Sequence, residues 1–194
     1  MGELMSLNHN DIIAVTNRSL CERPFLEQIE RVCRFKPKAL ILREKDLPEN
    51  EYERIAKQVM EICGRYDLLC ILHSFPQTAV KLNCRAIHLP LTVLKKSVDM
   101  LDNFDIVGTS VHSVEDALDA QRLGADYVTA GHIYETDCKK GLPPRGLEFL
   151  KNVCDSIDIP VYGIGGIKIN EEQIEEVKKC GASGGCIMSG MMRL

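Results

Sequence analysis

Short runs of apolar residues, many of them β-branched, recur along the chain and alternate with longer stretches of helical periodicity. Several of these runs contain no polar position, which is typical of parallel strands that are buried on both faces. Each run is also about as long as an ordinary buried strand. We therefore expect eight strands, at Ile12–Thr16, Ala39–Arg43, Leu68–His73, Ala86–Leu89, Ile106–Val111, Tyr127–Gly131, Val161–Gly165 and Gly185–Ser189.

The stretches between these runs predict helices. From Tyr52 to Cys63, apolar side chains return at the i, i+3, i+4 and i+7 positions of an amphipathic helix, and we expect Gly64 to end it. Ser113 is placed to cap a helix that starts at Val114 and stops before Gly124. Strands and helices therefore alternate along the whole chain.

Unbroken alternation of this kind predicts an α/β fold with a parallel sheet, and eight units predict a (β/α)8 TIM barrel. A doubly wound open sheet is the alternative, since a strand count does not prove closure. No linker divides the chain, so we expect a single domain over residues 1–194. After Gly190 only Met191–Leu194 remain, so the eighth helix is truncated or absent. That gap leaves room for a covering subunit, and a homo-oligomer is one expectation.

Composition narrows the function classes. The 194 residues include 24 Lys and Arg against 28 Asp and Glu, for a net charge of -4. This balance offers no basic field for nucleic acid, and no apolar run is long enough to span a membrane. The nine cysteines form no C-x-x-C pair, which favours buried thiols in a reducing compartment over disulfides or a metal site. We expect a cytoplasmic protein with no resident metal.

In a parallel barrel the active site lies where the strands end, so the residues after each predicted strand are the candidates. They are rich in cations, hydroxyls and histidines: Arg43, Lys45, His73, His88, Ser110, His112 and His132. Two cations after the second strand are suited to a carboxylate or phosphate, although a solvated charge run is an equal alternative. The loop Thr136–Gly141 adds Lys139 to the positive charge.

Glycine-rich segments follow the last two predicted strands, where barrels often bind phosphate through backbone N–H groups. They contribute Gly165 and Gly166 after the seventh strand, and Ser189 and Gly190 after the eighth. We expect these residues to bind a phosphate group. Ordinary turn formation is the alternative, and the missing eighth helix removes one usual set of donors.

Histidine can both accept and give a proton near neutral pH, so the strand-end histidines are the acid–base candidates. By residue type His132 and His112 stand out, with His73 and His88 beside them. A hydrogen-bonded structural histidine is the alternative for each. The residues alone do not choose among them.

Four segments together resemble the thiamine phosphate synthase superfamily. They are Leu42–Lys45, Gly108–His112, Gly124–Val128 and Ile164–Ile167, within a resemblance that runs from about Ile12 to Gly190. The segment Gly131–Gly146 is more specifically similar to the TenI branch, which holds thiazole tautomerases. The resemblance implies a (β/α)8 barrel and a thiazole phosphate ligand.

The two branches of this superfamily differ in chemistry. The synthase joins the thiazole phosphate to a pyrimidine pyrophosphate with Mg²⁺ and releases pyrophosphate. The tautomerase moves one proton, which turns a thiazole with an exocyclic double bond into the aromatic carboxythiazole phosphate. The resemblance implies that Arg43, Lys45, Ser110 and Lys139 contact the substrate.

This chain departs from the synthase pattern where the metal would bind. Ile41 replaces a glutamine of the second strand, and His73 and Ser74 stand where the synthase has an Asn-Asp pair. A further metal-binding aspartate of the synthase corresponds to a position near Thr92 of this chain. Because Mg²⁺ prefers carboxylate oxygens, these losses should weaken metal-assisted release of pyrophosphate. His132 replaces a proline and is the acid–base residue of the tautomerase branch.

The leading hypothesis is therefore a thiazole tautomerase-like isomerase of thiamine biosynthesis that needs no cofactor. His132 is its expected catalyst and His73 the competing one. The alternatives are a thiamine phosphate synthase with a divergent Mg²⁺ site, and a non-catalytic protein that binds a thiazole phosphate and regulates another process. The expected partner in each case is a small-molecule thiazole phosphate.

Overall fold

Eight parallel strands close into a barrel in the computed structural model, which describes residues 7–139 and 141–194. Each strand pairs with the next one along the chain, and β8 pairs with β1 through Ile13 and Cys186. The strands are β1 Ile12–Val15, β2 Ala39–Leu42, β3 Leu69–His73, β4 Ala86–Pro90, β5 Ile106–Val111, β6 Tyr127–Gly131, β7 Val161–Ile164 and β8 Gly184–Ile187. The predicted (β/α)8 barrel is confirmed, with strand ends shifted by one or two residues.

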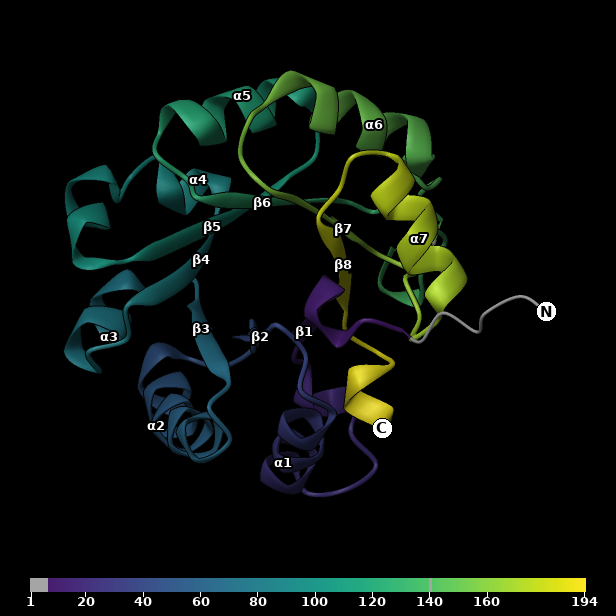
Figure 1. Ribbon diagram of the computed structural model, residues 1–194. Coiled ribbons are helices and arrows are strands. Elements are labelled where there is room, and N and C mark those ends of the chain that lie inside the picture. The colour runs from purple at the N-terminus through teal and green to yellow at the C-terminus, as the bar shows by residue number, and fades with distance from the viewer. Residues whose placement is uncertain (1–6, 140) are drawn as a thin grey trace.

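The helices form an outer layer around the barrel (Figure 1). They are α1 Phe25–Phe35, α2 Glu49–Arg65, α3 Pro76–Lys81, α4 Leu91–Leu94, α5 Val114–Arg122, α6 Gly146–Ser156 and α7 Glu171–Lys179. Short 3-10 turns, η1 to η5, lie at His9–Asp11, Arg18–Leu20, Val98–Asn103, Asp137–Lys139 and Met191–Arg193. None of the described helices combines the length and apolarity needed to cross a bilayer.

Helix ends match the sequence at one predicted position and not at another. The Ser113 hydroxyl accepts the N–H of Asp116 and caps α5 as expected. Gly64 does not end α2, which continues to Arg65. The left-handed residue that turns the chain is instead Asp67, with φ 53°. A short acidic side chain tolerates this conformation, so glycine is not required there.

The 3-10 turn η5 follows β8. Met191 and Met192 in this turn are fully buried, and the Gln28 side chain donates a 2.6 Å hydrogen bond to the Met191 carbonyl. Figure 1 shows the yellow turn beside α1, the helix that carries Gln28. Part of the space of an eighth helix is therefore filled by two methionines packed toward α1.

The strands are apolar throughout because they face two cores. In β1, Ile13 and Val15 point into the barrel, whereas Ile12 and Ala14 pack toward the helices. The barrel interior also holds Tyr127, which stands where its neighbouring strand carries Gly108. A Cβ atom on Gly108 would lie only 2.1 Å from Cζ of that tyrosine. The glycine therefore makes room for the ring.

A matched pair of glycine substitutions tests this packing. We expect Gly108→Ala to lower the free energy of unfolding by about 1–3 kcal/mol, because the buried tyrosine has to shift. Gly64→Ala, in an exposed helical position with no atom within 4 Å of the added Cβ, should raise it by about 0.5–1 kcal/mol. Urea denaturation of both variants measures the difference. Equal effects at the two positions would contradict the packing described here.

Candidate active site

A pocket of about 130 Å³ opens where the strands end. Its lining comes from β1 through β7 and the residues directly after them: Val15, Ile41, Arg43, Lys45, His73, His88, Pro90, Ser110, His112, Thr129 and Ile164. The structure thus brings together six of the seven strand-end candidates: Arg43, Lys45, His73, His88, Ser110 and His112. His132, Lys139 and the glycine segments lie outside this lining.

The pocket combines an apolar wall with positive charge. Val15, Ile41 and Ile164 supply aliphatic surface, and Arg43 and Lys45 supply two cations. The pKa of Lys45 is lowered, first by burial and then by repulsion from Arg43 and Lys139. Arg43 and Lys139 therefore both repel Lys45 electrostatically, so Lys139 belongs to the same electrostatic environment. An anion bound among them would relieve this repulsion.

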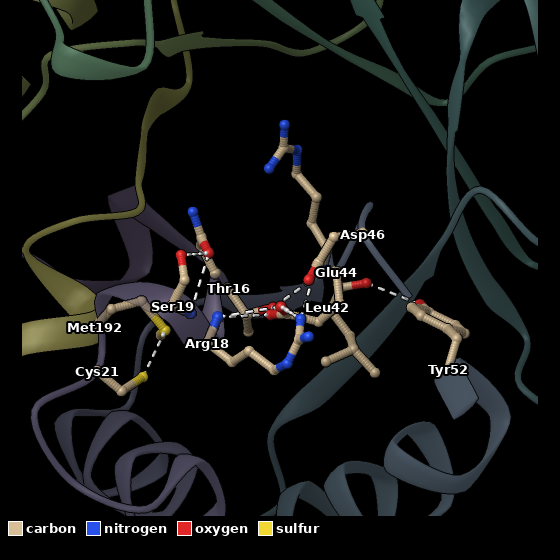
Figure 2. Close-up of polar contacts among 11 residues, drawn as sticks. Thr16, Arg18, Ser19, Cys21, Leu42, Glu44, Asp46, Tyr52 and Met192 are labelled. Carbon is tan, nitrogen blue, oxygen red and sulfur yellow. Dashed lines mark hydrogen bonds and ion pairs between the residues drawn. The ribbon is translucent and has the colours of Figure 1, made fainter. Parts of the chain in front are cut away.

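Buried Glu44 organises the loops that begin at the ends of β1 and β2. Its carboxylate accepts hydrogen bonds from the Thr16 hydroxyl at 2.6 Å and from the Arg18 backbone N–H at 3.1 Å. The Arg18 guanidinium lies 3.3 Å from Glu44 and 2.7 Å from Asp46 (Figure 2). Thr16 in turn accepts the backbone N–H of Arg43 at 2.9 Å. One carboxylate thus fixes the backbone that carries a pocket cation.

Tyr52 fixes the next pair of strand ends. Its hydroxyl donates to the Leu42 carbonyl at 2.7 Å, as Figure 2 shows, and accepts the backbone N–H of His73 at 2.7 Å. Sequence reasoning assigned no site role to Tyr52 or to Glu44. For Glu44 the available signal was a carboxylate two residues after a wholly apolar strand, whereas Tyr52 looked like an ordinary member of a helical stripe.

Two neutral histidines lie in the wall of the pocket. The rings of His73 and His88 are stacked with their centroids 5.7 Å apart. Burial, followed by the charges of Arg43 and Lys45, lowers the pKa of His88 to about 3. Burial and then His88, Arg43 and Lys45 also hold the pKa of His73 well below its usual value. Neither ring carries a charge at neutral pH.

The other two histidines near the barrel mouth, His112 and His132, differ in position. His112 lines the pocket, and its Nδ1 lies 2.8 Å from the carbonyl oxygen of Gly131. A carbonyl only accepts, so Nδ1 carries the proton and Nε2 is the basic nitrogen of the neutral ring. His132 stands at the rim, where its Nε2 is 3.4 Å from the Leu142 carbonyl. A Cβ on Gly165 would lie 2.3 Å from Cβ of His132, so the β7 loop touches this histidine.

Lys139 lies in a second, wider hollow beside the rim. This hollow of about 600 Å³ is formed by the loop after β6, with Glu135, Thr136, Asp137, Lys139 and Gly141–Pro144 in its lining. Leu142, whose carbonyl faces His132, belongs to the same loop. The loop therefore joins the predicted catalyst to the predicted substrate lysine.

The glycine segments follow β7 and β8, and Gly190 lies close to the loop after β7. Gly165 and Gly166 adopt φ values of 98° and 73°, which a residue with a side chain rarely adopts. A Cβ on Gly190 would lie 3.2 Å from Ile169 in the loop after β7. Ser189 precedes Gly190 and is exposed. Phosphate binding by Gly165, Gly166, Ser189 and Gly190 stays a prediction.

The donor set does not fit Mg²⁺. The lining of the mouth pocket contains no Asp or Glu, and the nearby carboxylate of Glu44 is already held by Thr16 and Arg18. Across residues 7–139 and 141–194, no group of three or more His, Cys, Asp and Glu side chains could hold a metal ion. Mg²⁺ prefers carboxylate oxygens together with substrate phosphates, and only the latter would be at hand here.

The Glu44 network makes a direct prediction for stability. We expect Glu44→Gln to lower the free energy of unfolding by about 2–3 kcal/mol, because an amide cannot accept all the hydrogen bonds that Thr16 and Arg18 donate. Asp46→Asn, which alters only the exposed partner of Arg18, is the control and should change stability little. Urea denaturation compares the two, and a loss of equal size in both would contradict the assignment.

The depressed pKa of His88 predicts a pH dependence of stability. In the unfolded chain this ring takes up a proton near pH 6.5, but in the folded protein only near a pKa of about 3. The unfolded state therefore binds more protons in that window, and the free energy of unfolding falls as pH is lowered through it. The slope from one such group reaches about 1.4 kcal/mol per pH unit.

We therefore expect His88→Gln to flatten the stability profile between about pH 6 and pH 4 by roughly that slope. Urea denaturation at closely spaced pH values measures it for both proteins. His73, whose pKa is shifted in the same direction, should leave a residual slope in the variant. Parallel profiles for the two proteins would mean that His88 is not the group responsible.

Comparisons with known proteins agree with this fold. The family model described as thiamine monophosphate synthase matches residues 12–191. A putative thiamine-phosphate synthase 2 of Aquifex aeolicus is 35% identical over 175 residues, which cover 89% of this chain and 92% of that protein. The thiamine-phosphate synthase of Clostridium acetobutylicum is 34% identical over 181 residues, covering 92% and 85%.

Among solved structures, thiamine phosphate pyrophosphorylase from Pyrococcus furiosus superposes with a TM-score of 0.81 at 29% identity. The match covers 95% of this chain and 88% of that one. These relatives are named as synthases, and nothing in the comparisons points specifically to the TenI branch. The match over nearly the whole chain makes this protein a member of the thiamine monophosphate synthase family, an enzyme of thiamine biosynthesis.

Proposed function

We propose that this enzyme is an isomerase that moves a proton on a carboxythiazole phosphate. The observation that carries the proposal is the composition of the mouth pocket, which offers cations, hydroxyls and imidazoles but no carboxylate. Such a lining suits a ligand that is itself anionic. It is poorly suited to a reaction that needs a divalent cation to neutralise a departing pyrophosphate.

The pocket matches the two parts of such a ligand. A carboxylate or phosphate pairs with Arg43 and Lys45 at the end of β2, with Lys139 adding charge from the loop after β6. The flat apolar ring packs against the aliphatic side chains of Ile41 and Ile164. Ile41 stands where the synthase pattern has a glutamine, which favours ring packing over hydrogen bonding at this point.

Tautomerisation requires a group that takes a proton from one carbon and returns it to another. The low pKa of His73 makes that ring a weak base, and its Nδ1 is already engaged with the Ser74 hydroxyl at 2.6 Å. His132 lies at the rim and is half-buried, and its Nε2 lies 3.4 Å from the Leu142 carbonyl, which leaves Nδ1 for a substrate. We therefore assign the proton transfer to His132.

The geometry around His132 supports its placement. His112 donates its Nδ1–H to the Gly131 carbonyl, one residue before the proposed catalyst, and Ile133 N–H bonds the Ile164 carbonyl at 2.9 Å. The backbone on both sides of His132 is thus tied to pocket residues. Negative charge that develops on the substrate during the transfer would be stabilised by Arg43 and Lys45, which follow β2.

The second candidate is a thiamine phosphate synthase, and the names of the relatives favour it. Ser110 and Lys139 also match positions that contact pyrophosphate in the synthase pattern, and Arg43 and Lys45 remain from its second-strand motif. The synthase would have to release pyrophosphate with cationic side chains in place of the missing carboxylates. A protein that binds the thiazole phosphate without turnover is the third outcome that the assay below distinguishes.

Two parallel assays separate these functions. We expect the purified protein to accelerate conversion of the exocyclic tautomer into the aromatic carboxythiazole phosphate, followed by NMR against buffer. With hydroxymethylpyrimidine pyrophosphate, a thiazole phosphate and Mg²⁺, we expect no thiamine phosphate beside an active control synthase. Robust coupling without isomerisation would overturn the proposal in favour of the synthase.

Two histidine variants then test the catalyst. We expect His132→Ala to lose about 10²–10⁴-fold of the isomerisation rate, which is the usual contribution of a general acid–base residue. His73→Gln should retain most of the rate, because the low pKa of His73 makes its ring a weak base. A His132→Ala protein that is folded and fully active would refute the assignment.

A further inference from the structure

A buried hydrogen-bonded chain runs from the barrel interior to the pocket wall. The Tyr127 hydroxyl lies 2.9 Å from Nδ1 of His88, and Nε2 of the same ring lies 2.8 Å from the Ser110 hydroxyl. Thr129 contacts Ser110 through a 3.0 Å hydroxyl pair. Ser110 and Thr129 line the pocket, whereas Tyr127 lies beneath it. The mechanism proposed above makes no use of Tyr127 or His88.

The direction of these hydrogen bonds follows from the protonation states of Tyr127 and His88. Burial, and then Cys186 and Tyr162, raise the pKa of Tyr127 well above its usual value, so its hydroxyl keeps its proton. Within the described part of the chain, the hydrogen-bond partner given for that hydroxyl is Nδ1 of His88. His88 is neutral, with a pKa of about 3, so one ring nitrogen accepts and the other donates.

These protonation states allow one assignment of the protons on His88, Ser110 and Thr129. Tyr127 donates to Nδ1, so Nε2 of His88 carries the ring proton and donates to the Ser110 oxygen. Ser110 and Thr129 own two hydroxyl protons, and one of them lies in the bond between the two oxygens. The other is left for the ligand. With the opposite tautomer, Nε2 would consume that proton and Tyr127 would have no acceptor.

We propose that Tyr127 and His88 are positioning residues that make the Ser110–Thr129 hydroxyl pair a net donor toward the pocket. The pair then selects a ligand oxygen that only accepts, such as a carboxylate or phosphate oxygen, over an amide or hydroxyl group that has to donate. The inference rests on the proposed function only in that the pocket binds an anion. Gly108 contributes by making room for the Tyr127 ring.

Phenylalanine at position 127 keeps the ring and removes the proton that sets the tautomer. We expect Tyr127→Phe to bind carboxythiazole phosphate about fivefold more weakly by calorimetry, the effect of one neutral hydrogen bond. Ser110→Ala should weaken binding of the same ligand by a similar factor. Because both changes act on the same donor, the double variant should be no weaker than Ser110→Ala alone. Losses that multiply would overturn the inference.

A spectroscopic readout separates positioning from a general loss of structure. In the native protein, ¹⁵N NMR of His88 should show a protonated Nε2 and an unprotonated Nδ1, and Tyr127→Phe should populate the opposite tautomer. Thermal unfolding confirms that the variant is folded. An unchanged ¹⁵N pattern in a folded Tyr127→Phe protein would overturn the inference, as would failure of the native pocket to bind either carboxythiazole phosphate or inorganic phosphate.

These results are independent of turnover. If Tyr127→Phe and Ser110→Ala are non-additive in a protein that does not isomerise the thiazole, the proposed function is wrong and this inference holds. If the protein is an active isomerase in which the two losses of affinity multiply, the proposed function holds and this inference is wrong.

Discussion

Closure of the parallel sheet is the constraint on which the rest of this molecule depends. The ladder between β8 and β1 removes the free sheet edges and places every strand end at one mouth. Residues as far apart in sequence as Val15 and Ile164 therefore line a single pocket. Closure also creates two cores, one inside the barrel and one beneath the helices, which explains why the strands are apolar on both faces.

Neutral and charged groups share the lining of the barrel mouth. The rings of His73 and His88 are buried and neutral, whereas Arg43 and Lys45 supply positive charge. The buried carboxylate of Glu44 is held in a network with Thr16 and Arg18. The lining of the pocket contains Arg43 and Lys45 but no Asp or Glu, which is the physical basis for assigning it an anionic ligand.

The names of the relatives and the chemistry of this pocket favour different members of one family. Overall similarity is dominated by the barrel scaffold, which any member has to preserve. The reaction depends on a few strand-end positions, and here they hold His73 and Ser74 where the synthase pattern has an Asn-Asp pair. We therefore give the donor set of the site more weight than the shared scaffold in choosing the reaction.

The sequence by itself determined the local features. Apolar runs located all eight strands to within one or two residues. These positions follow from burial, which is readable from the pattern of apolar residues without coordinates. Strand-end position likewise predicted that Arg43, Lys45, His73 and Ser110 would share a site, and the structure places these four in one pocket.

Only the tertiary structure decided which side chains meet. Glu44 finds its partner Thr16 28 positions away, and His88 meets Tyr127 39 positions away, because the stagger of the closed barrel sets those neighbours. It also put His132 at the rim and not in the pocket lining, and gave the turn after α2 to Asp67 in place of Gly64. No periodicity along the chain encodes these pairings, since they depend on how separate strands are aligned.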